Sequence, residues 1–418
     1  MNKLRAFLYE NQEAYLKPLY NLVACDTQVV GHGIFGGHEK NGQVYLKSLF
    51  ESMGAAEIVE DPMSETVLKK AVQMYQEGNL GHDQTDRYNL YAHFEGTSPK
   101  RLIFNGHVDT MPIGEADAWQ YPPIHATLDG DRIYGLGVCD MKGGLTAAIM
   151  AVKLLKDAGR ALPCHVTITS VVDEEGGGNG SIQAAMNGIK GDGLVVCEPT
   201  SGALILAHMG FVFFRVSIKG RANHSGAKWL GVSAIEKAMK MMAELEALEN
   251  DWQLAYDHPL LPKPSMNVGT IHGGSAASTV AGSCTFEVCI HYHPNTMSHA
   301  QVEAAFMNAI DLDDPWLKAN PPTVTMYQAG GAYEMPVDDA FVKCFQEAAK
   351  AVKGHEAVIE GSPAGCDSRI WQNIAGVPTI QFGPGNLAQC HAVNEYLSKS
   401  AYLESILVYA SLIEQFGK

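Results

Sequence analysis

The stretch that decides the fold runs from Cys164 to Thr200 and reads CHVTITSVVDEEGGGNGSIQAAMNGIKGDGLVVCEPT. Residues 164–175 are rich in β-branched residues and predict a buried strand, residues 180–191 predict a helix, and residues 192–200 predict a second strand. A strand, a helix and a further strand in close succession indicate a mainly parallel sheet with helices packed on it.

Three consecutive acids, Asp173, Glu174 and Glu175, follow the first of these strands and precede a run of glycines. Carboxylates this close repel one another, and removing them from water is unfavourable. We therefore expect a positive group to meet them. Asp173 itself is expected to lie at the surface or to cap a helix.

The same alternation continues on both sides of this stretch. Strands are predicted at 101–110 and 376–383, and helices at 143–159, at 338–352 and from about Ser400. Between these parts the pattern changes to alternating strands at 210–220, 265–274 and 284–294, with helices at 232–250 and 298–310 and a further strand candidate at 323–328. A chain of 418 residues exceeds one ordinary core. We predict an α/β, doubly wound catalytic domain (1–208 and 325–418) that a smaller, ferredoxin-like α/β lid (209–324) interrupts. Residues 61–87 show no clear periodicity of apolar residues, so we assign them only as a helix followed by a loop.

Composition excludes several classes of function. The formal charge of −16 argues against a nucleic-acid partner, which requires a basic surface. No apolar run is long enough to cross a membrane, and the amphipathic N-terminus has no signal-peptide pattern, so we expect a cytoplasmic protein. The nine cysteines include no C-x-x-C pair and are expected to be reduced.

Residues that can bind a metal ion recur where the predicted parallel strands end. Because the carboxyl ends of such strands share one edge of the sheet, these side chains are expected to meet. Two histidines and three carboxylates suit a pair of divalent ions, with zinc expected and cobalt or manganese as alternatives. The candidate ligands are His107, Asp140, Glu175, Glu198 and His391.

Each candidate also has a structural interpretation when taken singly. An aspartate before a helix usually caps it, and a pair of glutamates usually forms a solvated turn. The recurrence of ligand types at successive strand ends favours the metal site. Two ions can activate water near neutral pH and polarise a carbonyl, so Glu174, beside the ligand Glu175, is predicted to be the general base.

Six motifs resemble the two-metal family of aminoacylases, acetylornithine deacetylases and succinyl-diaminopimelate desuccinylases, which also contains carboxypeptidases and dipeptidases. In chain order they read NGHVDTMP, DRIYGLGVCDMKGG, VVDEEGGGNGS, VVCEPT, GRANHSGAKWLGVSAIE and GPGNLAQCHAVNEY. The resemblance implies that His107 and Glu198 hold one ion, that Glu175 and His391 hold the other, and that Asp140 bridges both.

The resemblance also implies further roles. Asp109 would orient His107, and a cis peptide bond would follow Asp140. The lid would form a homodimer and supply His224 as an oxyanion donor to the neighbouring subunit. Arg369, in GCDSRIW, would anchor a substrate carboxylate, and Asn267 would lie near the substrate.

One segment departs from the family pattern. Where many deacylases have an arginine in a strand that leads to a proline, this chain has HYHP, with His291 and His293. The candidate metal centre, the base Glu174 and the resemblance together predict a metal-dependent amidohydrolase that removes an acyl group from an N-acyl amino acid or a close analogue. The alternatives are a carboxypeptidase or dipeptidase with the same centre, a binding protein without activity, and a structural site with a single metal ion.

Overall fold

The computed structural model describes residues 1–418, which form two compact units. Unit 1 comprises residues 1–206, 335–360 and 366–418, and unit 2 comprises residues 207–334 and 361–365. The lid prediction placed its second boundary earlier, at 324. The unit extends further because β12 (Thr323–Gly330) pairs with β9 (Gly210–Lys219) and so belongs to the same sheet.

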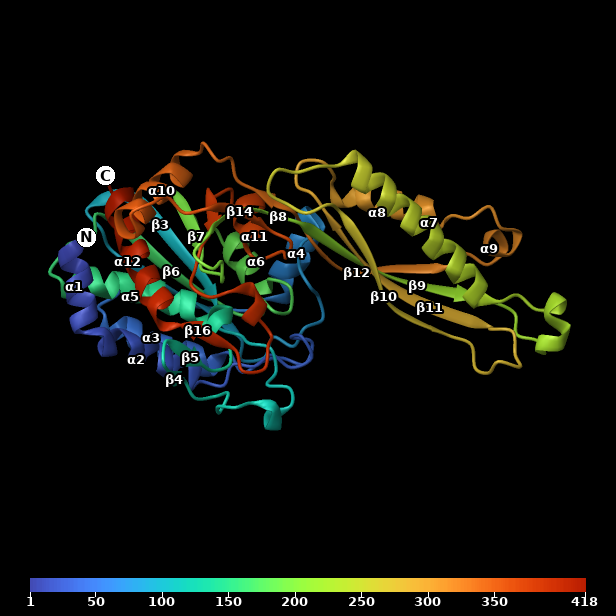
Figure 1. Cartoon of the computed structure of the whole chain (residues 1–418), viewed down its shortest axis with the longest axis horizontal. Coiled ribbons are helices and arrows are strands. Elements are labelled where there is room, and N and C mark those ends of the chain that lie inside the picture. The colour runs from blue at the N-terminus through green and yellow to red at the C-terminus, as the bar shows by residue number, and fades with distance from the viewer. The chain divides into compact units, whose positions relative to one another are not determined.

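Unit 1 is an α/β domain, as predicted (Figure 1). Its helices are α1 (Asn2–Glu10), α2 (Gln12–Val23), α3 (Lys40–Ser52), α4 (Glu65–Tyr75), α5 (Gly143–Asp157), α6 (Asn179–Met186), α10 (Ala340–Lys353), α11 (Ser368–Asn373) and α12 (Lys399–Phe416). Its principal strands are β1 (Glu57–Pro62), β2 (Tyr88–Phe94), β3 (Ser98–His107), β6 (Cys164–Val171), β7 (Gly193–Val196), β8 (Leu204–His208), β14 (Ile359–Ser362) and β15 (Thr379–Gln381). A small separate sheet contains β4 (Thr127–Asp129), β5 (Arg132–Tyr134) and β16 (Tyr396–Ser398).

The large sheet is mixed rather than mainly parallel. Its order is β1-β2-β6-β3-β7-β15-β8-β13, with β13 spanning Tyr333–Glu334 and β14 paired to β8. Only the four central strands, β6, β3, β7 and β15, run parallel to their neighbours in this set. The predicted site lies after the carboxyl ends of these four strands. Side chains at the carboxyl ends of neighbouring parallel strands share one edge of the sheet, so the expectation that the ligands meet there still holds.

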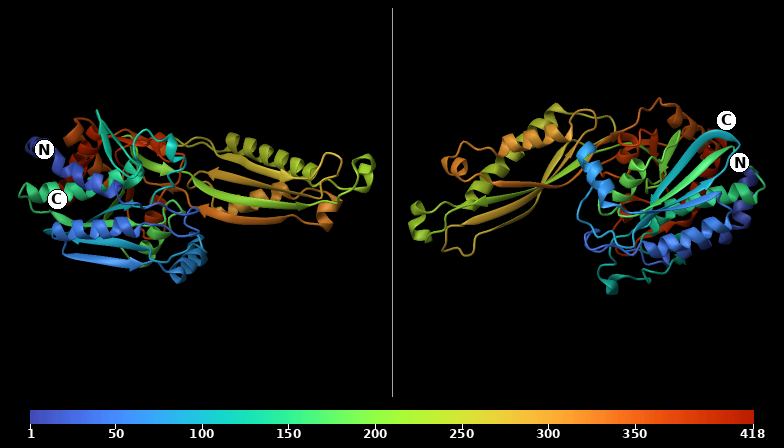
Figure 2. Two further views of the ribbon diagram at one scale, coloured as in Figure 1. Left: turned by 90° about the horizontal axis from the view of Figure 1, so that it is seen from below. Right: turned by 180° about the vertical axis from the view of Figure 1, so that it is seen from behind.

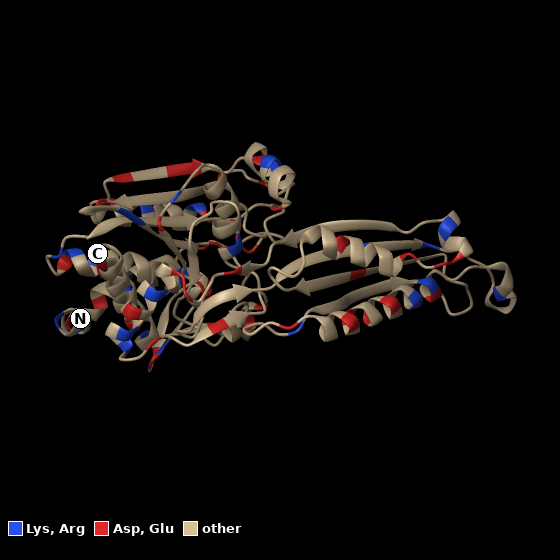
Figure 3. Cartoon of the chain, turned by 90° about the horizontal axis from the view of Figure 1, so that it is seen from above, with Lys and Arg blue, Asp and Glu red and all other residues tan.

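Helices cover both faces of this sheet (Figure 2). The central helix α5 packs against α12, and almost every residue of α5 from Gly143 to Leu155 is buried. On the opposite face α6 packs against α4 and α11. Edge strand β1 carries Glu57, Glu60 and Asp61 (Figure 3), charges that discourage pairing with another chain at this edge.

Unit 2 has the predicted ferredoxin-like order of elements. The chain passes through β9, α7 (Ala234–Ala255), β10 (Ser265–Gly273), β11 (Ser283–Tyr292), α8 (His299–Ile310), α9 (Pro315–Ala319) and β12. The sheet order is β10-β11-β9-β12, and all pairs are antiparallel. Strand β9 alternates buried and more exposed residues, and its Phe214 stacks on Phe306 of α8 with ring centroids 4.1 Å apart. No helix in either unit combines the length and apolar character needed to span a bilayer.

Candidate metal centre

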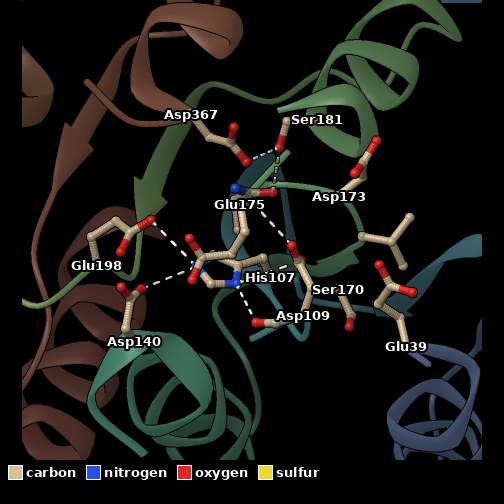
Figure 4. Close-up of polar contacts among 12 residues, drawn as sticks. Glu39, His107, Asp109, Asp140, Ser170, Asp173, Glu175, Ser181, Glu198 and Asp367 are labelled. Carbon is tan, nitrogen blue, oxygen red and sulfur yellow. Dashed lines mark hydrogen bonds and ion pairs between the residues drawn. The ribbon is translucent and has the colours of Figure 1, made fainter. Parts of the chain in front are cut away.

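The ends of the four parallel strands bring the predicted ligands together. Figure 4 labels four of them, His107, Asp140, Glu175 and Glu198. Strand β3 ends at His107, β6 leads into residues 173–175, β7 is followed shortly by Glu198, and the chain after β15 loops to His391. Asp140 comes from the irregular helical turn η2 (Val138–Lys142) that precedes α5. The peptide bond between Asp140 and Met141 is cis, as the resemblance predicts.

The side chains form two groups that could each hold a metal ion. One contains His107, Glu174 and Glu198, and the other contains Asp140, Glu175 and His391. Within each group the candidate ligand atoms lie within 4.8 Å of one another. Imidazole and carboxylate ligands suit zinc and related divalent ions, so these residues fit the pair of divalent metal ions that the sequence predicts.

The two groups meet at Asp140. Its Oδ1 lies 3.2 Å from His107 Nε2, and its Oδ2 lies 3.4 Å from His391 Nε2. The two oxygens of one carboxylate therefore face the two histidines. His391 Nε2 also lies 2.9 Å from Glu175 Oε2, and His107 Nε2 lies 3.8 Å from Glu198 Oε1. This arrangement suits the bridging role that the resemblance implies for Asp140.

Asp109 fixes the orientation of His107. The Nδ1–H of His107 donates to the backbone carbonyl of Asp109 at 3.0 Å, and the Asp109 carboxylate lies 3.6 Å from the same nitrogen. A proton on Nδ1 leaves the Nε2 lone pair free for an ion. The Asp109 carboxylate also accepts the backbone N–H of Glu175 at 3.0 Å, so one residue ties two ligands together.

Sequence reasoning missed Glu395, which holds the turn that carries Asp140. The buried Glu395 carboxylate accepts the backbone N–H groups of Gly137 and Cys139, each at 2.7 Å, and that of Asp140 at 3.0 Å. The residue lies in the quoted motif GPGNLAQCHAVNEY, but a glutamate four residues after a ligand does not by itself reveal that role.

The electrostatics of the centre reflect crowded carboxylates. Burial raises the pKa of Glu175, with the neighbouring Asp140 adding to the effect. Burial likewise raises the pKa values of Glu174 and Glu198 well above the usual range. Hydrogen bonds to Asp140 and Glu175 raise the pKa of His391 to about 10. Excess buried negative charge of this kind is relieved by bound cations.

The first of the three acids has a different role from the one predicted. Asp173 is fully buried rather than at the surface, and its Oδ1 lies 3.0 Å from Nη2 of Arg87. The positive group expected beside the acids is therefore present in the chain itself, at least for Asp173. It comes from the end of the 61–87 segment, which the sequence pattern could not assign beyond helix plus loop.

The structure does not support Arg369 as a free anchor for a substrate carboxylate. Its side chain is 2% exposed, and its Nε donates to Glu77 at 3.2 Å. Its other groups donate to the carbonyls of Cys366 at 2.7 Å and Gly177 at 3.1 Å. The resemblance implied that Arg369 binds a substrate carboxylate, whereas the carboxylate that it contacts in the structure is that of Glu77.

The two predicted lid residues are exposed within unit 2. His224 Nδ1 accepts the backbone N–H of Gly226 at 3.1 Å, which places the proton of a neutral ring on Nε2. Asn267 lies on β10 opposite Cys289 of β11. The unusual His293 is buried and bonds the Pro262 carbonyl at 2.6 Å, which indicates a structural role.

The fold and the paired ligand groups suit a metallohydrolase. The sequence model of Peptidase family M20/M25/M40 matches residues 103–415, and the chain belongs to this family. The family that the quoted motifs resemble is thereby confirmed.

Known proteins support the same assignment. N-formyl-4-amino-5-aminomethyl-2-methylpyrimidine deformylase of Bacillus subtilis (strain 168) is 31% identical over 356 residues, which cover 78% of this chain and 82% of that protein. Acetylornithine deacetylase of Aliivibrio salmonicida (strain LFI1238) is 28% identical over 331 residues, 78% of this chain and 84% of that protein. An M20 family metallo-carboxypeptidase, Sso-CP2 from Sulfolobus solfataricus, matches with a TM-score of 0.76 at 18% identity, covering 96% of this chain and 99% of that chain. At 18% identity, the match to the Sulfolobus solfataricus structure supports a shared fold and nothing further.

Proposed function

We propose that this M20 hydrolase is a two-metal amidohydrolase that removes an acyl group from an N-acyl amino acid or a close analogue. The observation that carries the proposal is the pair of ligand groups that share Asp140. In this proposal His107 and Glu198 hold one ion, Glu175 and His391 hold the other, and Asp140 contacts both. Two zinc ions, when bound, would supply Lewis acidity and an activated water.

The chain's own residues supply the proton transfers and the orientation. Glu174 is proposed to take a proton from water and return it to the leaving nitrogen, a role that its place beside His107 and Glu198 supports. Asp109 keeps His107 in the tautomer that can bind an ion. The Nε2–H of His224 is proposed to donate to the oxygen of the reacting carbonyl, and its tautomer supports this role.

The environment of Arg369 bears on the choice of substrate. Because its guanidinium is already bonded to Glu77 and to two backbone carbonyls, a substrate that depends on this group for its carboxylate is disfavoured. Among close analogues of N-acyl amino acids, an N-acyl amine without a carboxylate fits better. The substrate in the name of the Bacillus subtilis relative, an N-formylated aminomethylpyrimidine, is such a compound. A carboxypeptidase or dipeptidase remains the alternative, and the Sulfolobus neighbour is described as a carboxypeptidase.

A substrate panel tests the proposal. N-formyl, N-acetyl and N-succinyl derivatives of amino acids and of aminomethylpyrimidine, together with dipeptides, are assayed after zinc, cobalt and manganese are added separately. We expect cleavage of N-acyl compounds and bound metal at two ions per chain. Cleavage confined to dipeptides would favour the alternative. Two bound ions without turnover of any compound would favour a binding protein, and a single ion would favour a structural site.

We also propose a homodimer through the lid and a cytoplasmic location. Unit 2 exposes large apolar side chains, among them Trp229 at 79% and Leu254 at 86%, and β10 is an edge strand with mostly exposed residues. Exposed apolar groups on an open edge support a contact with a second chain. All nine cysteines are free, which suits a reducing compartment.

A further inference from the structure

A buried ion cluster lies behind the turn that carries Glu174 and Glu175. Its centre is Arg87, whose side chain is fully buried. The guanidinium Nε donates to Glu39 at 3.1 and 3.3 Å, and Nη2 contacts both Glu39 and Asp173. Glu39 and Asp173 are also fully buried. One cation therefore meets two carboxylates from distant parts of the chain.

Asp173 transmits this contact to the catalytic turn. Its backbone has a φ of +58°, in the left-handed region that few non-glycine residues adopt, although aspartate does so more readily than most. Its Oδ2 accepts from His82 Nδ1 at 2.8 Å and from Asn179 Nδ2 at 2.6 Å, while Oδ1 faces Arg87. The side chain is thus held from three directions.

The turn has a definite consequence for the next two residues. Glu174 and Glu175 are adjacent in sequence but join different ligand groups, one with His107 and the other with His391. The backbone carbonyls of Asp173 and Glu174 accept the N–H groups of Gly178 at 3.0 Å and Gly177 at 2.7 Å, which closes the turn. The carboxylates diverge because the chain turns sharply at this point.

The packing around Asp173 leaves no room for an alternative arrangement. A Cβ added at Gly33 would lie 2.1 Å from Asp173 Oδ1, and one added at Gly176 would lie 2.3 Å from the same atom. The loop before α3 and the glycines of the turn therefore close directly on the carboxylate.

We propose that Arg87 is a positioning residue of the metal centre, which pairs with Asp173 and thereby holds the turn that places the base Glu174 beside His107 and Glu198 and the ligand Glu175 beside Asp140 and His391. The proposal rests on the two-metal hydrolase proposed above. It gives a function to the end of the 61–87 segment. Removing the guanidinium would leave Glu39 and Asp173 buried without their cation, and the turn would relax to separate or hydrate them.

The test compares Arg87→Met with wild type and with Leu46→Ala. Leu46 is fully buried in α3 and outside the cluster, so its truncation lowers stability through a cavity alone. Metal-free protein is titrated with Co²⁺ and followed by its visible absorption, the thermal midpoint is recorded, and kcat and KM are measured on the best substrate. For Arg87→Met we expect a loss of about 10- to 100-fold in Co²⁺ affinity or kcat with little change in KM. Leu46→Ala should lose thermal stability only.

The outcomes separate this proposal from the proposed function. If wild type binds fewer than two Co²⁺ ions, the two-metal hydrolase fails. If wild type binds two ions and Arg87→Met binds them equally well with unchanged kcat, Arg87 serves stability alone and the positioning role is overturned. Should Arg87→Met not fold, Arg87→Lys carries the test. It keeps a cation but loses the planar fork that reaches two carboxylates, so a smaller loss in the same direction is expected, and wild-type behaviour overturns the proposal.

Discussion

At the scale of single residues, Glu174 is the sharpest test of the proposed chemistry. A carboxylate oxygen of Glu174 lies within 4.8 Å of the candidate ligand atoms of His107 and Glu198. The proposed mechanism nevertheless assigns Glu174 to proton transfer and not to metal binding. Glu174→Gln keeps the size and removes the base, so turnover should fall at least about 100-fold. Metal analysis of the purified variant should still find two ions per chain. A variant that loses an ion would make Glu174 a ligand, and one with normal turnover would remove it from the mechanism.

His93 allows a prediction about pH at a site remote from the ligands. Burial, with a smaller contribution from Arg101, lowers the pKa of His93 below 6.5. Between that lowered pKa and 6.5 the unfolded chain binds more protons than the folded chain, so stability rises with pH across this window and is lost as the pH falls through it. Thermal midpoints measured at about pH 7.5 and about pH 5.5 should therefore differ less in His93→Gln than in wild type.

The exposed His355 provides the control for this measurement. His355→Gln should show the same change in thermal midpoint between the two pH values as wild type. If His93→Gln also behaves as wild type, burial of the His93 ring has no effect on the pH dependence of stability.

At the scale of elements, the pair between Arg369 of α11 and Glu77, just beyond α4, joins two helices on one face of the sheet. Both side chains are almost completely buried, at 2% and 6% exposure. Arg369→Met leaves a carboxylate buried without this cation, so the free energy of unfolding should fall by about 3–5 kcal/mol. Chemical denaturation measures the loss. The double variant Arg369→Met, Glu77→Gln should recover part of it, because the buried charge of Glu77 is removed together with that of Arg369.

The same variants decide whether Arg369 also contacts substrate. Partial recovery of stability in the double variant, with KM unchanged for N-acyl amino acids, would establish a structural role. A KM that rises only for substrates with a carboxylate would restore the anchor that the sequence resemblance implied.

At the scale of the whole molecule, the prediction concerns assembly. We expect His224 of one subunit to serve the site of its neighbour, so two inactive variants should complement each other. His224→Ala and Glu174→Ala are each expected to lose at least about 100-fold in turnover. After co-expression with random pairing, about half of the dimers are hybrids, and each hybrid has one complete site of two, so activity should return to about a quarter of wild type.

The result discriminates between two arrangements. If His224 acts within its own subunit, every site in the mixture lacks one group and activity stays at the level of the single variants. A monomer in sedimentation at working concentration would also contradict the proposal. His224→Ala alone should keep its metal ions, because it lies outside both ligand groups.

The sequence by itself determined the class of fold and the family, and it predicted the candidate ligands. Residue type sets ligand chemistry, and the strand pattern sets the order in which ligands reach the edge of the sheet, so His107, Asp140, Glu175, Glu198 and His391 were predictable from local patterns. The structure brings these five residues together, although their occupancy by metal ions stays a prediction.

Only the tertiary structure decided which charges meet. Arg87 forms an ion pair with Asp173, and Arg369 forms one with Glu77. The Glu395 carboxylate accepts the backbone N–H of Asp140. The partners in each of these contacts are far apart in sequence. Local periodicity carries no information about such partners, because burial and proximity arise only when separate elements pack. The mixed order of the sheet also escaped prediction. The flanking strand β2 is buried along most of its length, so it lacks the alternation of buried and exposed residues that usually marks an antiparallel strand.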